Sequence, residues 1–113
     1  MAKKPETVFK ERILPKLRDL PNSWWFVTQM IALLGIPDVV GVVNGRFVAL
    51  ELKKSEREAR KKREGHALQN YVLGLIRKAG GIGEKVYPEN FELIYSELLE
   101  ISETGFEDHH NLL

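Results

Sequence analysis

The sequence predicts a single α/β domain in which helices flank a small mixed sheet. Three observations lead to this prediction. Apolar residues recur at helical spacing near both ends of the chain, β-branched and aromatic residues form short runs between them, and an Asn44-Gly45 dipeptide separates two of those runs. The chain has 113 residues, enough for one modest core, and we expect a domain over residues 1–101 and a polar tail over 102–113.

The first predicted elements are a helix and a strand. Residues 5–20 predict the helix, because Pro5 suits a first turn and apolar residues follow at helical spacing. Pro15 removes one helical hydrogen bond, so this segment forms either one kinked helix or two short ones. Residues 24–29 predict the strand, because they are rich in aromatic and β-branched side chains, and the apolar residues 30–34 stay unassigned.

The next predicted element is a β-hairpin with strands over residues 37–43 and 46–53. Asn-Gly between two apolar, β-branched runs is the strongest short-range signal for a two-residue turn. If Asn44 and Gly45 form the loop, the residue numbers of cross-strand partners sum to 89. Because both faces of the hairpin are largely apolar, we expect its strands to be central in the sheet and covered on both faces.

A helix, a strand and a second helix complete the predicted fold. Residues 66–79 predict the first helix, which Gly80-Gly81 would end. Its apolar face would consist of Leu68, Val72, Leu75 and Ile76. A strand over residues 82–87 and a helix over 88–101 then give the order helix, strand, strand, strand, helix, strand, helix.

The net charge of +1 hides a strongly basic segment. Residues 53–63 hold seven basic and two acidic side chains, a net charge of +5, and Ser55 with Glu58 forms a capping-box pattern within it. We expect this segment to bind a polyanion, although a solvated helix without an apolar stripe is the alternative. The candidate DNA-binding residues are Lys54, Arg57, Arg60, Lys61, Lys62 and Arg63.

Composition excludes several classes of protein. The chain has no cysteine, so disulfides and thiolate metal sites are excluded. No apolar run approaches the length of a membrane span, and the N-terminus lacks the apolar stretch of a signal peptide. We therefore expect a cytoplasmic protein without a membrane partner.

Asp38 and Glu51 are the candidate catalytic carboxylates. Their numbers also sum to 89, so the hairpin would place them opposite each other, with Cβ atoms about 4.5–5.5 Å apart. Such like charges repel unless a cation lies between them, and Mg²⁺ or Mn²⁺ prefers oxygen ligands. Lys53 shares the strand face of Glu51. It would orient or deprotonate a metal-bound water, or stabilise charge on a phosphate, and the sequence does not choose between these roles.

Two further polar residues fall on helix faces that the apolar periodicity turns inward. Glu6 lies on the stripe of Phe9 and Ile13, where it would share the metal; alternatively, it only favours the helix dipole. Gln69 lies in line with Val72 and Ile76. It would orient a metal ligand or a nucleophilic water, or it is a core amide bonded to the backbone.

These residues form a pattern that resembles a known family. The Gly-Ile-Pro-Asp sequence of residues 35–38, followed by the Glu-Leu-Lys sequence of residues 51–53, looks like the signature of the PD-(D/E)XK nuclease superfamily. The closer similarity is to its VRR-NUC branch, small nuclease domains found alone in phages or fused to larger repair enzymes, with archaeal Holliday-junction resolvases as relatives. In that branch a helix with a Gln and a Gly-Gly end follows, here Gln69 and Gly80-Gly81, so the resemblance spans residues 5–87.

The resemblance implies a restriction-endonuclease-like sandwich and a divalent-metal-dependent endodeoxyribonuclease that uses Mg²⁺ or Mn²⁺. The implied metal ligands are Glu6, Asp38, Glu51 and the backbone carbonyl of Leu52. Lys53 would be the catalytic lysine and Gln69 a supporting site residue. DNA is the implied partner, with branched DNA or four-way junctions as candidate substrates, and the twofold dimers of many relatives make a homodimer a further expectation.

Three alternatives stay open. A nicking or end-processing nuclease would have the same site without a preference for branched DNA. A DNA-binding module with the nuclease fold and little activity would have no reason to keep Asp38, Glu51 and Lys53 together. An interaction domain in which Glu51 and Lys53 are surface charges would expose the hairpin face, whereas the apolar pattern predicts burial.

Overall fold

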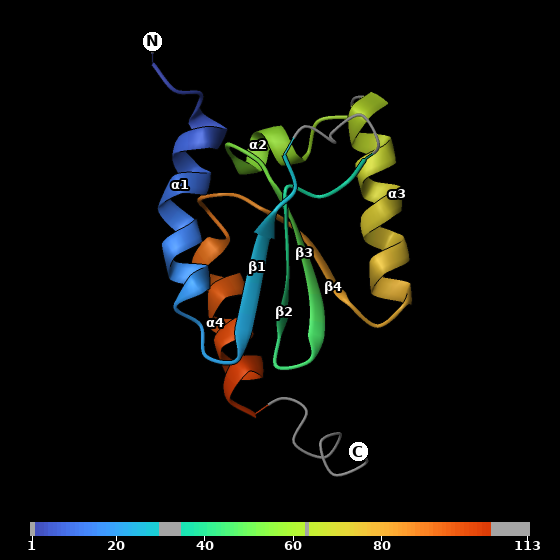
Figure 1. The fold of residues 1–113 in the computed structure, drawn as a ribbon. Coiled ribbons are helices and arrows are strands. Elements are labelled where there is room, and N and C mark those ends of the chain that lie inside the picture. Colours follow the sequence, from blue (N-terminus) through green and yellow to red (C-terminus); the bar gives the residue numbers. More distant parts are fainter. Residues whose placement is uncertain (1, 30–34, 63, 105–113) are drawn as a thin grey trace.

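Four strands and four helices form within residues 2–29, 35–62 and 64–104, the part of the chain that the computed structural model describes. The elements are α1 (Pro5–Arg18), β1 (Ser23–Val27), β2 (Val39–Val43), β3 (Arg46–Leu52), α2 (Glu56–Ala59), α3 (Glu64–Lys78), β4 (Ile82–Val86) and α4 (Phe91–Thr104). The sheet has the order β1-β2-β3-β4, in which β4 is parallel to β3 and the other pairs are antiparallel (Figure 1). This confirms the predicted α/β fold and its element order, with α2 as an additional single turn. Among the described residues, no helix is both long and apolar enough to cross a membrane.

The β2–β3 hairpin has the predicted turn and register. The turn residues Asn44-Gly45 have φ angles of 48° and 87°, and a type I′ turn requires positive φ at both. The register pairs Val39 with Leu50, so the partner numbers sum to 89 as predicted. When this register is continued by one residue, Asp38, which directly precedes β2, comes to lie opposite Glu51 near the end of β3.

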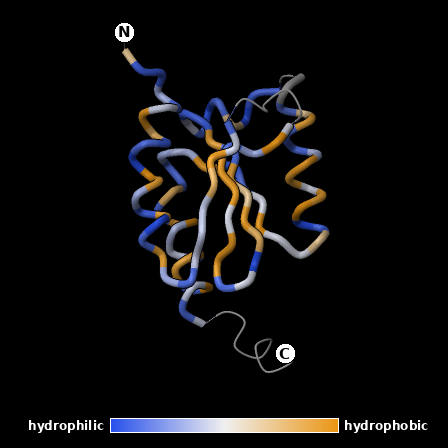
Figure 2. The backbone as a smooth tube through the Cα atoms, viewed as in Figure 1, coloured by the Kyte–Doolittle hydropathy of each residue, from blue (hydrophilic) through white to orange (hydrophobic). Residues whose placement is uncertain are grey.

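The core lies on one face of the sheet, which α1 and α4 cover (Figure 1). Phe9 of α1 packs edge-on against Phe91 of α4, with ring centroids 6.1 Å apart. Figure 2 shows hydrophobic residues concentrated in β2 and β3, whereas the helices alternate between hydrophobic and hydrophilic positions. The core residues are Phe9, Ile13, Leu17, Leu20, Trp25, Val39, Val43, Val48, Leu50, Leu52, Val86, Phe91, Ile94 and Leu98. This packing anchors the central strands and thereby fixes the residues at their ends.

The second face of the sheet is covered only in part, which corrects the expectation that both faces of the hairpin are buried. Val42 and Phe47 remain 40% and 45% exposed, because α3 packs mainly over β3 and β4. On β1, Trp25 points into the core, while Trp24 and Phe26 are exposed and stack on each other with ring centroids 6.1 Å apart. A partly exposed apolar surface therefore lies on β1, β2 and β3 beside α3.

Three helices differ in detail from the expectations. α1 is one continuous helix through Pro15. α3 turns Leu73 inward and leaves Leu68 and Leu75 42% and 49% exposed, so the predicted apolar face of this helix is wrong at these positions. α4 continues past residue 101 and fully buries Ser102, so the polar tail does not begin at residue 102. The unassigned residues 30–34 and the tail residues 105–113 lie outside the described residues.

We expect Gly35→Ala to destabilise the fold by about 1–2 kcal/mol, the cost of placing an L-residue in the left-handed region. Gly35 has a φ of 71°, and a Cβ atom there would lie 2.6 Å from Cγ of Leu68 on α3. The loop that leads to Asp38 therefore packs closely against α3. Urea unfolding monitored by circular dichroism measures the change.

Gly74→Ala is the matched control, because a Cβ atom at this position inside α3 would meet nothing within 4 Å. Replacing a helical glycine with alanine should stabilise the protein by up to about 1 kcal/mol. The two substitutions should therefore act with opposite signs. A neutral or stabilising Gly35→Ala would contradict the close packing of this loop on α3.

Candidate functional site

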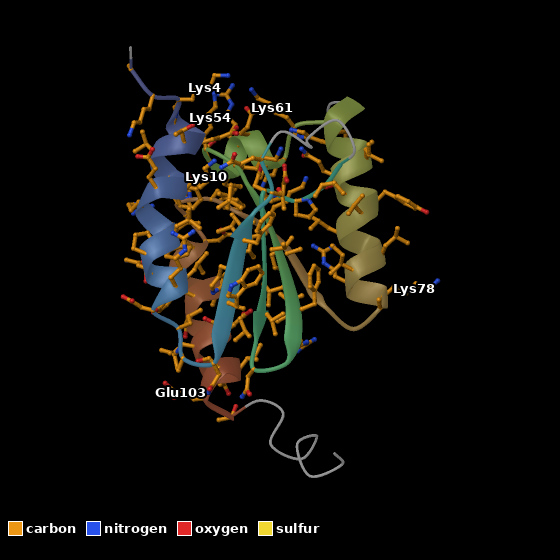
Figure 3. All side chains as sticks on the ribbon, viewed as in Figure 1. Lys4, Lys10, Lys54, Lys61, Lys78 and Glu103 are labelled. Carbon is orange, nitrogen blue, oxygen red and sulfur yellow. The ribbon has the colours of Figure 1, made fainter. Side chains whose placement is uncertain are left out.

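The predicted site residues meet at one end of the sheet, where β3 ends and α2 follows (Figure 1). Asp38 directly precedes β2, Glu51 lies near the end of β3, and Lys53 is the first residue after that strand. The first turns of α1 and α3 lie at the same end (Figure 1). Figure 3 shows basic side chains at this end, among them Lys4, Lys54 and Lys61.

Groups from both neighbouring strands hold Asp38 in place. Its backbone carbonyl accepts a hydrogen bond from the backbone N–H of Thr28 at 3.0 Å. Its carboxylate Oδ2 accepts from the backbone N–H of Leu52 at 2.8 Å. The Thr28 hydroxyl also donates to the carbonyl oxygen of Pro37 at 2.6 Å. The Asp38 carboxylate is thus tied to β3 beside Glu51, as the hairpin register predicts.

Glu51 is a buried carboxylate, 3% exposed, with one unsatisfied oxygen. Within the described residues its Oε1 has no hydrogen-bond partner, whereas its Oε2 lies 3.6 Å from Nζ of Lys53. Burial, together with the nearby Asp38 carboxylate, raises the pKa of Glu51 to about 8, although Lys53 acts in the opposite direction. When both carboxyl groups are ionised, they therefore need more positive charge than Lys53 supplies.

The Lys53 ammonium is 5% exposed and is surrounded by acceptors. It donates to Oε1 of Gln69 at 2.8 Å and lies 3.1 Å from Nε2 of His66 and 3.6 Å from Oε2 of Glu51. An ammonium has three N–H donors, and three acceptors are present here. Gln69 therefore holds the lysine rather than the backbone, and its predicted role in orienting a metal ligand or a water stays a prediction.

The contact of His66 with Lys53 is a feature of the site that the sequence reasoning missed. Nδ1 of His66 lies 2.7 Å from the carbonyl oxygen of Lys61, and its Nε2 faces the Lys53 ammonium. Because a carbonyl only accepts and an ammonium only donates, Nδ1 carries the proton and Nε2 accepts. The neutral ring thus connects the basic segment to Lys53. His66 lies three residues before Gln69, so the two residues share a helix face, and this spacing could have indicated that both lie at the site.

Glu6 lies near the carboxylate pair but does not face inward as predicted. It is exposed, because it lies in the first turn of α1, one turn before the first buried residue, Phe9. With Asp38 and Leu52 it lines a small cavity of about 80 Å³. Within the described residues, no group of three or more acidic or histidine side chains is placed to hold a metal ion. A direct role for Glu6 as a ligand therefore stays a prediction.

The basic segment borders the site and is mostly exposed. Ser55 caps α2 as predicted, with its Oγ accepting from the backbone N–H of Glu58 at 3.1 Å. The helix is not wholly exposed, however, because Glu58 and Ala59 are buried. The predicted DNA-binding residues that are exposed are Lys54, Arg57, Arg60, Lys61 and Lys62, and Arg63 lies outside the described residues.

Lys85 of β4 is a second residue that the sequence reasoning missed. It is the partner of Glu51 in the parallel β3–β4 pair and shares the same face of the sheet. Its half-buried ammonium donates to the backbone carbonyl of Ala59 at 3.1 Å. Burial, followed by the nearby Lys53 ammonium, lowers the pKa of Lys85. The site therefore has two cations beside its two carboxylates.

The donor set fits a hard divalent cation. Asp38 and Glu51 offer carboxylate oxygens, and the unsatisfied Oε1 of Glu51 is the kind of buried acceptor that a cation would satisfy. Mg²⁺ is commonly held by one or two protein carboxylates and keeps several waters, so a third acidic residue is not required. The Leu52 carbonyl stays a predicted ligand at the end of β3.

Comparison of the chain with protein-family models, with curated proteins and with solved structures found no match.

Proposed function

We propose that the protein is a divalent-metal-dependent endodeoxyribonuclease of the VRR-NUC type. One observation carries the proposal: the half-buried Asp38 and the buried Glu51 lie beside Lys53, and Oε1 of Glu51 has no hydrogen-bond partner among the described residues. Carboxylates for a hard cation next to a fixed ammonium suit the hydrolysis of a phosphodiester bond. The basic segment at the same end of the sheet supports DNA as the partner.

Each site residue has a task in this proposal. Asp38 and Glu51 hold Mg²⁺ or Mn²⁺, which when bound supplies a more acidic water and positive charge for the phosphate. Lys53 stabilises negative charge on the phosphate as its ammonium, because all three of its contacts are with acceptors. Gln69 and His66 keep the ammonium beside Glu51.

The observed hairpin supports the family resemblance. The superfamily signature requires the Asp of residues 35–38 and the Glu-x-Lys of residues 51–53 to meet, and the hydrogen bond from Leu52 to Asp38 brings them together. A preference for branched DNA, the restriction-endonuclease-like relationship and a homodimer stay predictions. So does a cytoplasmic location, in a host cell if the chain is encoded by a phage.

The test is a cleavage assay on supercoiled plasmid, linear duplex and a four-way junction, each with Mg²⁺, Mn²⁺ or EDTA. We expect cleavage with either metal and none with EDTA. Faster cleavage of the junction would indicate a structure-specific enzyme, and nicking of the plasmid without that preference would indicate the nicking alternative. Cleavage that persists in EDTA would contradict the metal mechanism, and DNA binding without cleavage of any substrate would favour the DNA-binding module.

A further inference from the structure

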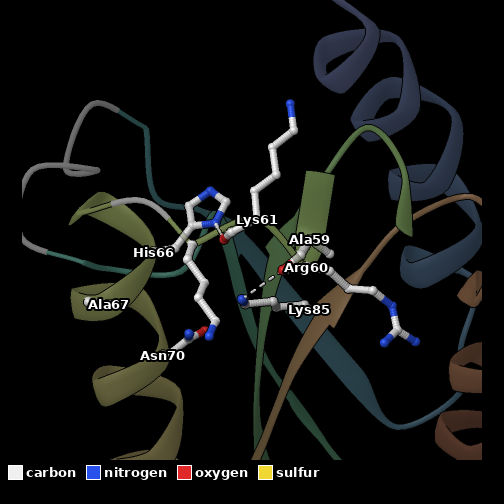
Figure 4. A pocket seen from close by; sticks show the side chains of 8 residues that line it. Ala59, Arg60, Lys61, His66, Ala67, Asn70 and Lys85 are labelled. Carbon is white, nitrogen blue, oxygen red and sulfur yellow. Dashed lines mark hydrogen bonds between the residues drawn. The ribbon is translucent and has the colours of Figure 1, made fainter. Parts of the chain in front are cut away.

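A basic pocket lies beside His66 (Figure 4). It has a volume of about 570 Å³ and is lined by residues of β4, α3 and the segment from α2 to α3. This volume is within the range of about 300–1,000 Å³ that is usual for ligand sites. Figure 4 shows Asn70 of α3 and Lys85 of β4 facing each other across it. His66 lines the pocket and also contacts Lys53, so the pocket lies next to the candidate site.

The pocket has an excess of positive charge. Arg60, Lys61, Lys62 and Lys85 line it, and none of its lining residues is acidic. Arg60 and Lys61 have carboxylate partners on α2, at 2.8 and 3.0 Å. Lys62 and Lys85 form no ion pair within the part of the chain that the structure describes, where the hydrogen-bond partner of the Lys85 ammonium is the carbonyl of Ala59.

Lys85 is the cation best placed to bind an anion beside the site. Its ammonium is half-buried, so an anion that enters the pocket meets it with less competition from water than at an exposed lysine. The exposed amide of Asn70 lies opposite and offers N–H donors. A cation and an amide donor beside a site for phosphodiester hydrolysis suit a second phosphate of the same strand.

We propose that this pocket binds a phosphate group of the nucleic-acid strand next to the phosphate that is cleaved, with Lys85 and Asn70 as the contacting residues. The identity of the ligand as a nucleic-acid phosphate rests on the proposed function. The phosphate belongs either to the interior of the strand or to a strand end. Because His66 lines the pocket and also contacts Lys53, a phosphate held in the pocket would help to set which phosphodiester bond reaches the carboxylates.

The experiment measures binding without cleavage. Three fluorescent single-stranded oligonucleotides of one length, bearing a 5′-phosphate, a 3′-phosphate or no terminal phosphate, are titrated in EDTA against the wild-type protein and two variants. Asn70→Asp puts a negative charge into the pocket at an exposed helix position, and Lys85→Met removes the cation. Ser96→Asp on α4 and Lys78→Met at the far end of α3 are exposed substitutions with the same charge changes (Figure 3).

We expect Asn70→Asp to bind the oligonucleotides about tenfold more weakly at low salt. For Lys85→Met, we expect the slope of the logarithm of the binding constant against the logarithm of the salt concentration to be smaller by about 0.7, the value for one phosphate contact on a single strand. Equal weakening for all three strands would assign an interior phosphate, and weakening confined to one phosphorylated strand would assign that terminal phosphate. The proposal would be overturned if both pocket variants bound the oligonucleotides as tightly as wild type. It would also be overturned if the two control variants weakened binding as much as the pocket variants do. Plasmid cleavage in Mg²⁺ is measured separately, so loss of the proposed function and loss of the pocket are distinguishable.

Discussion

Lys53→Met should reduce DNA cleavage by about 10²–10³-fold, the loss that is typical when one group that stabilises transition-state charge is removed. Methionine keeps most of the length and the apolar stem of lysine but cannot donate to Gln69 or His66. The buried Glu51 carboxylate would also lose the cation that lies 3.6 Å from it. DNA binding should fall only slightly, because the exposed basic segment is intact. Initial rates of plasmid nicking, with binding measured in parallel, separate the two effects.

Lys78→Met is the matched control for this substitution. It makes the same chemical change at an exposed position at the opposite end of α3, away from the site (Figure 3). Its cleavage rate should stay within about twofold of wild type, because surface substitutions seldom shift stability by more than about 0.5 kcal/mol. A Lys53→Met protein that folds normally and cleaves at the wild-type rate would exclude Lys53 from the mechanism.

Glu51→Gln should make the metal-free protein more stable than wild type at pH 8 by an amount on the order of a few kcal/mol. Burial raises the pKa of Glu51 from its ordinary value of 4.5 to about 8 in the folded state. Between these values the unfolded chain releases its proton and the folded protein keeps it, so wild-type stability falls as the pH rises through this window. Glutamine does not titrate, and the variant should lack this loss.

Urea unfolding in EDTA at several pH values between 4 and 9 measures the difference between the two proteins. Glu97→Gln, at an exposed position on α4, controls for the removal of a carboxylate and should change stability by less than about 0.5 kcal/mol. Saturating Mg²⁺ should stabilise wild type at pH 8 and leave Glu51→Gln unchanged, because the ligand is lost. If the stability difference between Glu51→Gln and wild type did not change from pH 5 to 8, Glu51 would ionise as readily in the folded state as in the unfolded chain.

The hairpin, and with it the carboxylate pair, was predictable from the sequence because its determinants are local. Asn44-Gly45 specifies the turn type through positive φ, and the two-residue period of the strands then fixes every partner. The capping of α2 by Ser55 and the end of α3 at Gly80 are equally local. These features depend on residues within a few positions of one another.

The features that escaped prediction depend on tertiary packing. Lys85 is the partner of Glu51 in a parallel pair, and the register of that pair is set by how the connecting helix α3 packs on the sheet and not by a turn. α3 carries apolar residues around much of its circumference, so the period alone could not distinguish the buried Leu73 from the exposed Leu75. His66 meets Lys53 only because the segment after α2 brings the carbonyl of Lys61 to the ring.

The central claim is that Asp38 and Glu51 together hold a divalent cation, and a calorimetric Mn²⁺ titration at pH 8 tests it most directly. Wild-type protein and the double variant Asp38→Asn/Glu51→Gln are titrated under the same conditions, with circular dichroism to verify that both are folded. We expect saturable Mn²⁺ binding by wild type and none by the double variant. Equal binding by both proteins, or no binding by wild type, would contradict it.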